Sequence, residues 1–491
     1  MKKNIIKSLV LSALLGSASF LTSCNDALEI IQDGEVHQQD IFTSVTHLEK
    51  FLIGDVYSAA EPSNEIYLTA VFTDELKPGY RSGGQEYGLH RHYLSDNESY
   101  TTNVWVQHYK LINRVNRLLE GATKIVPANE SEQLKYNTII AEARSLRAWA
   151  YVQLSSYFST DMKDKNALGV MLVKDVPTLY DQFPRATNGE VYELINQDLA
   201  FAETVLKSGD NQYKVDINFV NALQARFNLY IGEYGKAKEY ANKVISQSGL
   251  GLSSKESYAS IWDDTLRGEI VFAFQRIGSG PSGNIGSYFN TNSSQYTGSP
   301  KWVWGRNLFN LLNETPGDIR RTVYVDPTSL IDPNYLTSES PFNSDVLIIN
   351  KYPGKLTYAT KNDLKIFRLS EMYFIAAEVE ARDGNLSEAA DLVNAIRTAR
   401  ISSDATLPAF TSSQDALAAI LKERRIELAL EGHRLIDLKR LAVEAGVAMD
   451  RNVTDDIVEV HNLENGSYKY TLPVPLSELS ANPNIIQNPG Y

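Results

Sequence analysis

Near its C-terminus the chain reads Glu423-Arg424-Arg425-Ile426-Glu427-Leu428-Ala429-Leu430-Glu431-Gly432-His433-Arg434-Leu435-Ile436-Asp437-Leu438-Lys439-Arg440. Opposite charges recur in this stretch at spacings of three and four residues, which are the spacings of neighbours on one face of a helix. We therefore predict a helix that ion pairs fix against its neighbours. A catalytic role for the same charges is the less favoured interpretation, because no nucleophile or set of metal ligands accompanies them.

Two other regions repeat each other in register and predict paired helices. The repeated positions are Ala225, Gly232, Ala237 and Val244 in the first region and Ala377, Gly384, Ala389 and Ile396 in the second. Small residues at these positions let two antiparallel helices approach closely, as in the tetratricopeptide hairpin. Generic helix packing with coincidental alanines is the alternative. We predict a mainly α fold in which tetratricopeptide-like helical hairpins form a single scaffold, with loop-rich excursions and a few short strands.

Capping boxes predict where several helices begin. The matching pairs are Thr46 and Glu49, Asn129 and Glu132, Thr187 and Glu190, Asn385 and Glu388, and Thr411 and Gln414. Each pair precedes apolar residues at helical spacing.

Two segments, about 63–100 and about 250–361, are rich in Gly, Ser, Asn and Pro and break the helical pattern. The second contains a strand candidate at Glu269 to Gln275. Binding residues concentrate on long loops that a rigid scaffold carries, so these two excursions are the candidate binding regions.

The first residues predict export and lipid attachment. Lys2, Lys3 and Lys7 precede an uncharged, mainly apolar stretch, which is typical of a secretory signal peptide. The stretch ends in Leu-Thr-Ser-Cys, which resembles a bacterial lipobox. We predict a signal peptide at 1–23, lipid attached to Cys24, and one domain over 24–491, because no linker-like segment divides the chain. A cysteine left unmodified by cleavage elsewhere is the alternative.

Composition and motifs argue against several classes of function. The formal charge of -13 disfavours a nucleic-acid surface. Gly278, Gly280 and Gly283 spell G-x-G-x-x-G, but Pro281 and a turn-rich stretch replace the helix that a dinucleotide site needs. His90 and His92 form the one close histidine pair, which we interpret as exposed loop or strand rather than as metal ligands. We predict no cofactor and no metal site.

The C-terminal third carries specific motifs. They are the stretch Arg368 to Glu378, the charged stretch quoted above, and an ending that runs from Pro473 and Pro475 through Asn482 and Pro483 to Gln487, Asn488, Pro489, Gly490 and Tyr491. Together they closely resemble SusD/RagB-like nutrient-binding outer-membrane lipoproteins of Bacteroidetes. The resemblance extends over the whole chain, with the signature at about 362–491.

This resemblance implies a lipid-anchored protein of the outer membrane that faces the cell exterior. It would bind oligosaccharides without catalysis and hand them to a SusC-like TonB-dependent transporter. A binder of peptides or glycoprotein fragments and a mainly structural lid remain alternatives on the same scaffold. A surface glycoside hydrolase is also an alternative, since the separation of two carboxylates in space decides that chemistry.

Sugars stack on aromatic rings and bond to polar side chains at their edges. The candidate glycan-binding residues are Asp74, Arg81 and Tyr87 in the first excursion and Tyr288, Tyr296, Trp302, Trp304 and Arg306 in the second. Loop packing is the alternative for each of them. Trp105 begins an apolar helical run, and we assign it to the core.

Overall fold

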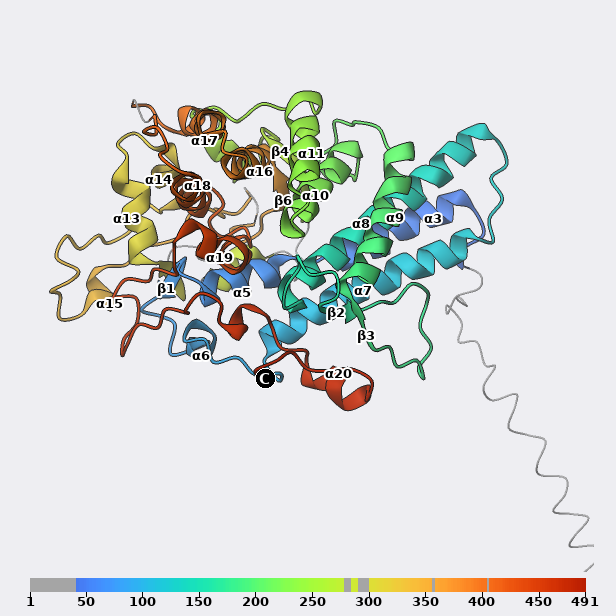
Figure 1. The fold of residues 1–491 in the computed structure, drawn as a ribbon, viewed down its shortest axis with the longest axis horizontal. Coiled ribbons are helices and arrows are strands. Elements are labelled where there is room, and N and C mark those ends of the chain that lie inside the picture. The colour runs from blue at the N-terminus through green and yellow to red at the C-terminus, as the bar shows by residue number, and fades with distance from the viewer. Residues whose placement is uncertain (1–40, 278–283, 290–299, 356–357, 404–405) are drawn as a thin grey trace, which may run out of the picture.

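The structure is a computed structural model that describes residues 41–277, 284–289, 300–355, 358–403 and 406–491. The predicted signal peptide, Cys24, Tyr296 and the G-x-G-x-x-G motif from Gly278 to Gly283 lie outside the described residues. The fold is mainly helical, as predicted, with short strands (Figure 1). No helix within the described ranges has both the length and the apolar character that a membrane crossing requires.

The first half of the chain contributes α3 (Val45–Phe51), the π-helical turn η3 (Leu52–Val56), α4 (Tyr57–Ala59), α5 (Ser63–Phe72), α6 (Tyr87–His90), α7 (Ser99–Ala122), α8 (Glu130–Phe158), α9 (Asn188–Val205), α10 (Ile217–Tyr230) and α11 (Tyr234–Gln247). The second half contributes η4 (Tyr258–Ile261), α12 (Ile285–Phe289), α13 (Arg306–Glu314), α14 (Ile319–Tyr324), α15 (Pro341–Ser344), α16 (Leu369–Arg382), α17 (Leu386–Arg400), α18 (Ser413–Glu427), α19 (Arg434–Ala445), η5 (Tyr468–Tyr470) and α20 (Leu476–Ala481).

The long helices α7, α8 and α9 lie side by side at one end of the molecule, with α3 against them (Figure 1). Asn129 caps α8, and Thr187 and Glu190 form the predicted capping box of α9. The prediction for Thr46 is wrong, because Ser44 accepts the capping hydrogen bond of α3 instead. Trp105 is fully buried, as predicted.

The two predicted hairpins are confirmed as α10 with α11 and α16 with α17. The repeated small and aliphatic residues, among them Ala225 and Ala377, are fully buried. Gly232 and Gly384 each adopt φ = 82° in the turn between the two helices, a left-handed conformation that favours glycine. Because α11 also packs against α16, the two hairpins stack into one scaffold.

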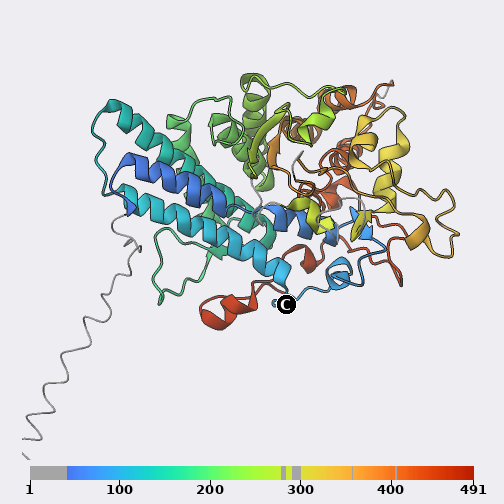
Figure 2. The same cartoon turned by 180° about the vertical axis from the view of Figure 1, so that it is seen from behind.

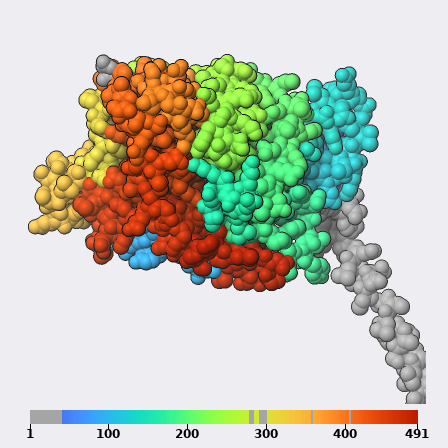
Figure 3. Space-filling model, viewed as in Figure 1, coloured from blue at the N-terminus to red at the C-terminus, as the bar shows by residue number. Residues whose placement is uncertain are grey.

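The charged stretch at 423–440 forms two helices and not the single helix that its spacing predicts. The turn between α18 and α19 places Leu430 at φ = 57° and Gly432 at φ = 82°, and left-handed residues of this kind end a helix. The two helices pack against each other, and α19 also lies against α5. Residues 413–491 cover a broad strip of the face seen in Figure 3.

The ion pairs predicted for this stretch are confirmed; some join its two helices, and others reach distant segments. The Glu427 carboxylate accepts hydrogen bonds from Arg368 at 2.8 Å, Arg400 at 2.9 Å and Arg320 at 3.2 Å. Burial alone would raise the pKa of Glu427, but the three guanidinium groups hold it well below its ordinary value. Arg424 pairs with Asp437 at 2.7 Å in the same way. We call Glu427, its three arginines and their other carboxylate partners the Glu427 network.

The strands form three two-stranded antiparallel sheets within the described residues: β1 (Leu76–Pro78) with β5 (Trp302–Trp304), β2 (Leu168–Met171) with β3 (Arg185–Thr187), and β4 (Ile270–Phe274) with β6 (Leu364–Arg368). The β4 strand lies inside the predicted Glu269 to Gln275 segment. The β1–β5 pair joins the two excursions, with Leu76 opposite Trp304 and Pro78 opposite Trp302. The first excursion begins with helix α5 rather than with the loop that its composition predicts.

Candidate functional site

The two tryptophans predicted as sugar platforms belong to the core. Trp302 and Trp304 are 1% and 0% exposed. The indole of Trp302 donates to the Tyr67 hydroxyl at 2.8 Å, and that of Trp304 donates to the Tyr324 carbonyl at 2.9 Å. Side chains alternate between the two faces of a strand, so a strand at the surface would leave one face open to solvent. In β5 both faces are covered. The prediction that the two tryptophan rings contact ligand is therefore wrong.

Asp74 and Arg306 are also structural. Arg434 binds the Asp74 carboxylate with two hydrogen bonds of 2.8 Å, and Arg425 lies 3.2 Å from it. Burial would raise the pKa of Asp74, but Arg425 and Arg434 hold it well below its ordinary value. Arg306 is buried against Asp345 at 2.6 Å. With their polar atoms buried and paired, the predicted glycan contacts of these two side chains are wrong.

His90 and His92 are buried rather than exposed, which corrects the interpretation from sequence. Their Nε2 atoms lie 3.2 Å from the Leu76 carbonyl and 2.9 Å from the Phe72 carbonyl. Burial lowers the pKa of His90 to about 4. Over the ranges that the structure describes, no group of three or more His, Cys, Asp and Glu side chains is arranged to hold a metal ion.

The remaining predicted residues, Arg81, Tyr87 and Tyr288, keep accessible surface. Arg81 is exposed, with its guanidinium 5.3 Å from the centre of the Tyr80 ring. Tyr87 is half-buried, and its hydroxyl lies 2.9 Å from that of Ser82. Tyr288 is half-buried in α12.

A continuous series of contacts connects two of these residues. The Tyr288 ring lies 4.9 Å from that of Tyr67, and the Tyr67 ring lies 5.6 Å from that of Tyr100. The Tyr100 hydroxyl donates to Glu86, the residue before Tyr87. Figure 2 shows α12 beside α5 on the face opposite to that of Figure 1. The structure therefore connects Tyr288 with Tyr87, and Arg81 precedes Ser82, which bonds to the Tyr87 hydroxyl.

Tyr288 borders an open cavity of about 460 Å³, within the range of about 300–1,000 Å³ that small-molecule sites occupy. It is lined by Ser58, Ala59, Glu61, Ser63, Asn64, Asn103, Val106, Gln107, Lys110, Asn284, Ser287 and Tyr288. We call it the Tyr288 cavity. Amides, hydroxyls and one aromatic ring dominate its lining, which suits a ligand with hydroxyl groups around an apolar ring face.

A relay of hydrogen bonds orients three of these side chains. The buried Glu65 carboxylate accepts from Gln107 Nε2 at 3.0 Å, so Gln107 Oε1 faces Asn64 and accepts from its Nδ2 at 2.7 Å. Asn64 Oδ1 in turn accepts from the Tyr288 hydroxyl at 3.3 Å. The carboxylate therefore determines which way each amide points before any ligand arrives.

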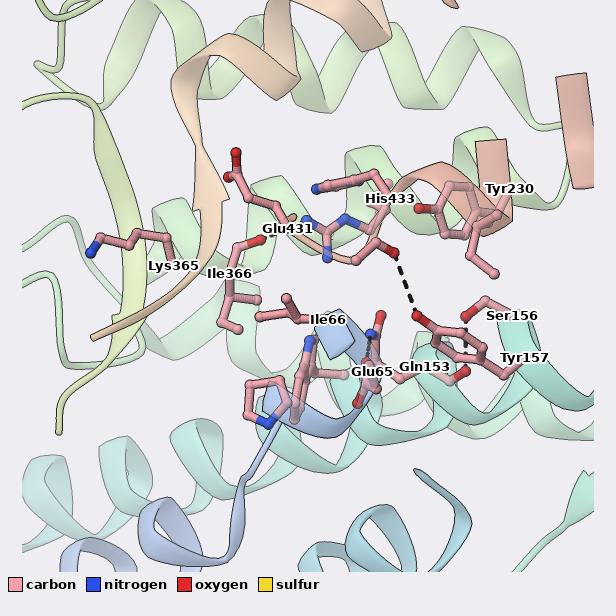
Figure 4. Close-up of a pocket in the computed structure, with 15 residues that line it drawn as sticks. Glu65, Ile66, Gln153, Ser156, Tyr157, Tyr230, Lys365, Ile366, Glu431 and His433 are labelled. Carbon is pink, nitrogen blue, oxygen red and sulfur yellow. Dashed lines mark hydrogen bonds between the residues drawn. The ribbon is translucent and has the colours of Figure 1, made fainter. Parts of the chain in front are cut away.

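A second cavity lies on the inner side of Glu65, where Figure 4 shows Glu65, Gln153 and Tyr157 facing Glu431 and His433. Its volume is about 30 Å³, about the share of one water molecule in the liquid. This interior cavity is therefore too small for a sugar.

Sequence reasoning missed the amide residues of the Tyr288 cavity. Asn103, Gln107 and Lys110 recur at helical spacing on α7 and share the face of the helix that borders the cavity. The sequence did contain a pattern that could have identified them, since these polar residues lie on the side of α7 opposite to the apolar stripe of Trp105 and Ile112. The pattern was weak, because uncharged polar residues on a helix usually mean only a solvated face.

A sequence model described as SusD family matches residues 321–491, and one described as starch-binding associating with outer membrane matches residues 27–229. SusD-like protein P25 of Formosa agariphila is 30% identical, covering 79% of this chain and 80% of that protein. SusD-like protein P2 of the same organism is 26% identical, covering 96% and 97%.

Solved structures share the fold. A SusD superfamily protein from Bacteroides thetaiotaomicron superposes with a TM-score of 0.77 at 24% identity, covering 91% of this chain and all of that one. A SusD-like carbohydrate binding protein from Bacteroides vulgatus gives a TM-score of 0.70 at 22% identity, covering 90% and 98%.

Proposed function

The chain belongs to the SusD family, and from this premise we propose that it is a cell-surface lipoprotein that binds glycans in the Tyr288 cavity. The observation that carries the proposal is the cavity itself. It combines one tyrosine ring with amides that a buried carboxylate has already oriented. A pyranose ring presents an apolar face to an aromatic ring and hydroxyls to amides, so the two surfaces are complementary.

Several polar residues beyond the cavity extend the proposed surface. Arg81 and Tyr87 keep accessible surface, and Lys301 pairs with Glu86, the residue before Tyr87, at 2.7 Å while its ammonium lies 5.4 Å from the centre of the Tyr67 ring. An oligosaccharide longer than the cavity would run over these side chains. The affinity should be modest, with a Kd of about 1 μM to 1 mM, because a shallow, wet site gains little from each contact.

We also propose that the chain works beside a membrane transporter. One matched family model is described as associating with outer membrane, and the Leu-Thr-Ser-Cys step resembles a lipobox that would anchor the chain through Cys24. A tether raises the effective concentration of two neighbours for each other. Glycan handed to a SusC-like TonB-dependent transporter could thus be transferred efficiently despite weak binding. No catalysis is part of the proposal.

A glycan and peptide array tests the proposed function. The mature chain is prepared with Cys24→Ser, so that it remains free of lipid, and is applied to immobilised oligosaccharides and peptides. We expect the protein to bind to immobilised glycans, and we expect the Tyr288→Ala variant to bind to the same glycans more weakly. Peptide binding without glycan binding would favour the peptide alternative, and product release from a bound glycan would favour the hydrolase.

A further inference from the structure

A larger cavity lies on the other side of α4, apart from the proposed glycan site. Its volume is about 880 Å³, and α3, η3, the first half of α8, the 211–214 segment and the end of β4 enclose it. The Tyr288 cavity and this one share Ser58, and the rest of their linings differ. We call it the Tyr57 cavity.

Apolar side chains dominate its walls and its mouth. Leu52, Ile139 and Phe274 are buried in the wall, while Ile53, Leu134 and Ile277 are 63%, 64% and 75% exposed around the opening. Aliphatic residues this exposed are in contact with water in the absence of a ligand. The rings of Tyr57, Tyr213 and Phe274 supply aromatic contacts.

Every charged side chain among the described lining residues is paired with an opposite charge, and the partner of Arg276, Glu61, belongs to the lining of the Tyr288 cavity. Glu49 pairs with Lys135 at 2.6 Å, Glu142 with Lys214 at 3.2 Å, and Arg276 with Glu61 at 3.5 Å. A charged ligand would lose its hydration without gaining a partner, so the cavity suits an uncharged one.

A buried carboxylate in the lining can still accept a hydrogen bond. The buried Glu142 carboxylate accepts from the Tyr57 hydroxyl at 2.7 Å and from Lys214. A carboxylate has about four acceptor sites, so Glu142 retains capacity to accept another hydrogen bond. The Tyr57 hydroxyl already donates to Glu142 and accepts from the Val215 amide at 2.8 Å. A ligand that reaches Glu142 must therefore bring a donor of its own.

The wall also contains η3, a π-helical turn, and such turns are frequently found at functional sites. Gly54 lies in this turn and borders the cavity, and a Cβ added there meets no atom within 4 Å. A side chain introduced at Gly54 would thus enter open space rather than strain the helix.

We propose that the Tyr57 cavity is a second ligand site, which takes an uncharged aromatic compound that carries a hydroxyl group. The apolar wall holds the ring, the paired charges disfavour ions, and the Glu142 carboxylate accepts a hydrogen bond from the ligand hydroxyl. This site goes beyond the proposed glycan binding and does not depend on it.

Three matched probes test the ligand class by fluorescence titration of the full mature chain. 2-Naphthol is uncharged at neutral pH and has a donor, 2-methoxynaphthalene keeps the ring system without the donor, and 2-naphthoate carries a charge. We expect saturable 1:1 binding of 2-naphthol, about fivefold to tenfold weaker binding of 2-methoxynaphthalene, and at least tenfold weaker binding of 2-naphthoate. Equal binding of all three would overturn the proposal.

Two matched tryptophan variants locate the site. Gly54→Trp adds an indole at the cavity wall, where it should compete with a ligand for the open space and weaken 2-naphthol binding at least about tenfold. Gly235→Trp is the control, because Gly235 is exposed on α11 and a Cβ there also meets no atom within 4 Å. Glycan binding should be unchanged in both variants, which separates this proposal from the proposed function. Unchanged 2-naphthol binding by Gly54→Trp would exclude the cavity.

Discussion

The Glu427 network and the Tyr288 cavity both gather polar side chains from distant segments, but they use them in opposite ways. In the network the charges are full, buried and paired with each other. In the cavity the polar groups are mainly neutral, and the Gln107 and Asn64 amides and the Tyr288 hydroxyl are aligned by the single carboxylate of Glu65. The charge-rich motif therefore stabilises the fold, whereas the neutral side chains of the Tyr288 cavity are the ones proposed to bind the glycan.

The most disruptive test of this contrast is Glu427→Ala. Three guanidinium groups would lose their shared carboxylate in the interior, so we expect a loss of about 5 kcal/mol in the free energy of unfolding, the upper end for breaking a buried ion pair. Urea unfolding measures it. Glu314→Gln is the control, because its pair with Lys422 is exposed and should be worth at most about 1 kcal/mol. Similar losses in both variants would contradict the structural role of the network.

Trp304→Ala tests whether the β5 tryptophans support the fold or the ligand. Since the ring is fully buried, we expect a loss of about 4 kcal/mol in the free energy of unfolding and no change in the glycan affinity of the folded protein. Thermal unfolding and titration calorimetry together measure both quantities. If the variant were as stable as the wild type but bound glycan more weakly, Trp304 would contact the ligand, as the sequence predicted.

A buried carboxyl next to the charged turn predicts a pH effect. Burial raises the pKa of Glu75 to about 7, with the Asp74 charge adding to the shift and the Leu430 amide opposing it. The folded state therefore keeps this proton to a higher pH than the unfolded state, and its contribution to stability is lost as the pH rises from about 4.5 to about 7. Glu75→Gln does not titrate.

Relative to the wild type, the free energy of unfolding of Glu75→Gln should rise by up to about 3 kcal/mol between pH 4.5 and pH 8. Urea unfolding at both pH values measures the change, and the comparison cancels groups that both proteins share, including the neighbouring Arg434 and Lys351. A difference independent of pH would show that Glu75 titrates as it does in the unfolded chain.

The smallest expected effect concerns the cavity. Tyr288→Ala removes the aromatic face, which should cost about 1–2 kcal/mol of glycan binding, or about fivefold to thirtyfold in Kd, with little change in stability. Calorimetry with the glycan selected by the array measures it. Tyr180→Ala is the control, since that ring is 91% exposed in the loop between β2 and β3. An equal loss of glycan affinity in both variants would show that the glycan does not bind against Tyr288.

The sequence predicts the scaffold well because helical packing leaves periodic marks. The alanines at Ala225 and Ala377 and the glycines at Gly232 and Gly384 lie where paired helices require small residues or left-handed turns. The same periodicity gave a wrong prediction of one continuous helix at 423–440, because charges spaced three and four residues apart also occur across a turn between two helices. Only the φ angles of Leu430 and Gly432 reveal the break.

The site was predicted less well, for a physical reason. The alternation Trp302-Val303-Trp304 predicts a strand but not what covers each face, and here the core covers both tryptophans. Tyr288 does border a cavity, yet Asn64, which accepts its hydrogen bond, and Gln107, which orients Asn64, are helix residues without a motif. Packing between segments far apart in the sequence decides which polar residues come into contact. The spacing of residues along the chain does not reveal these contacts.

The most direct test of the account is a crystal structure of the mature chain with the array-selected glycan bound. We expect a sugar ring against Tyr288, with its hydroxyls within hydrogen-bond distance of Asn64 and Gln107. A glycan bound elsewhere, for example in the cavity of about 510 Å³ that Tyr192, Asn196 and Asn228 line, would contradict it.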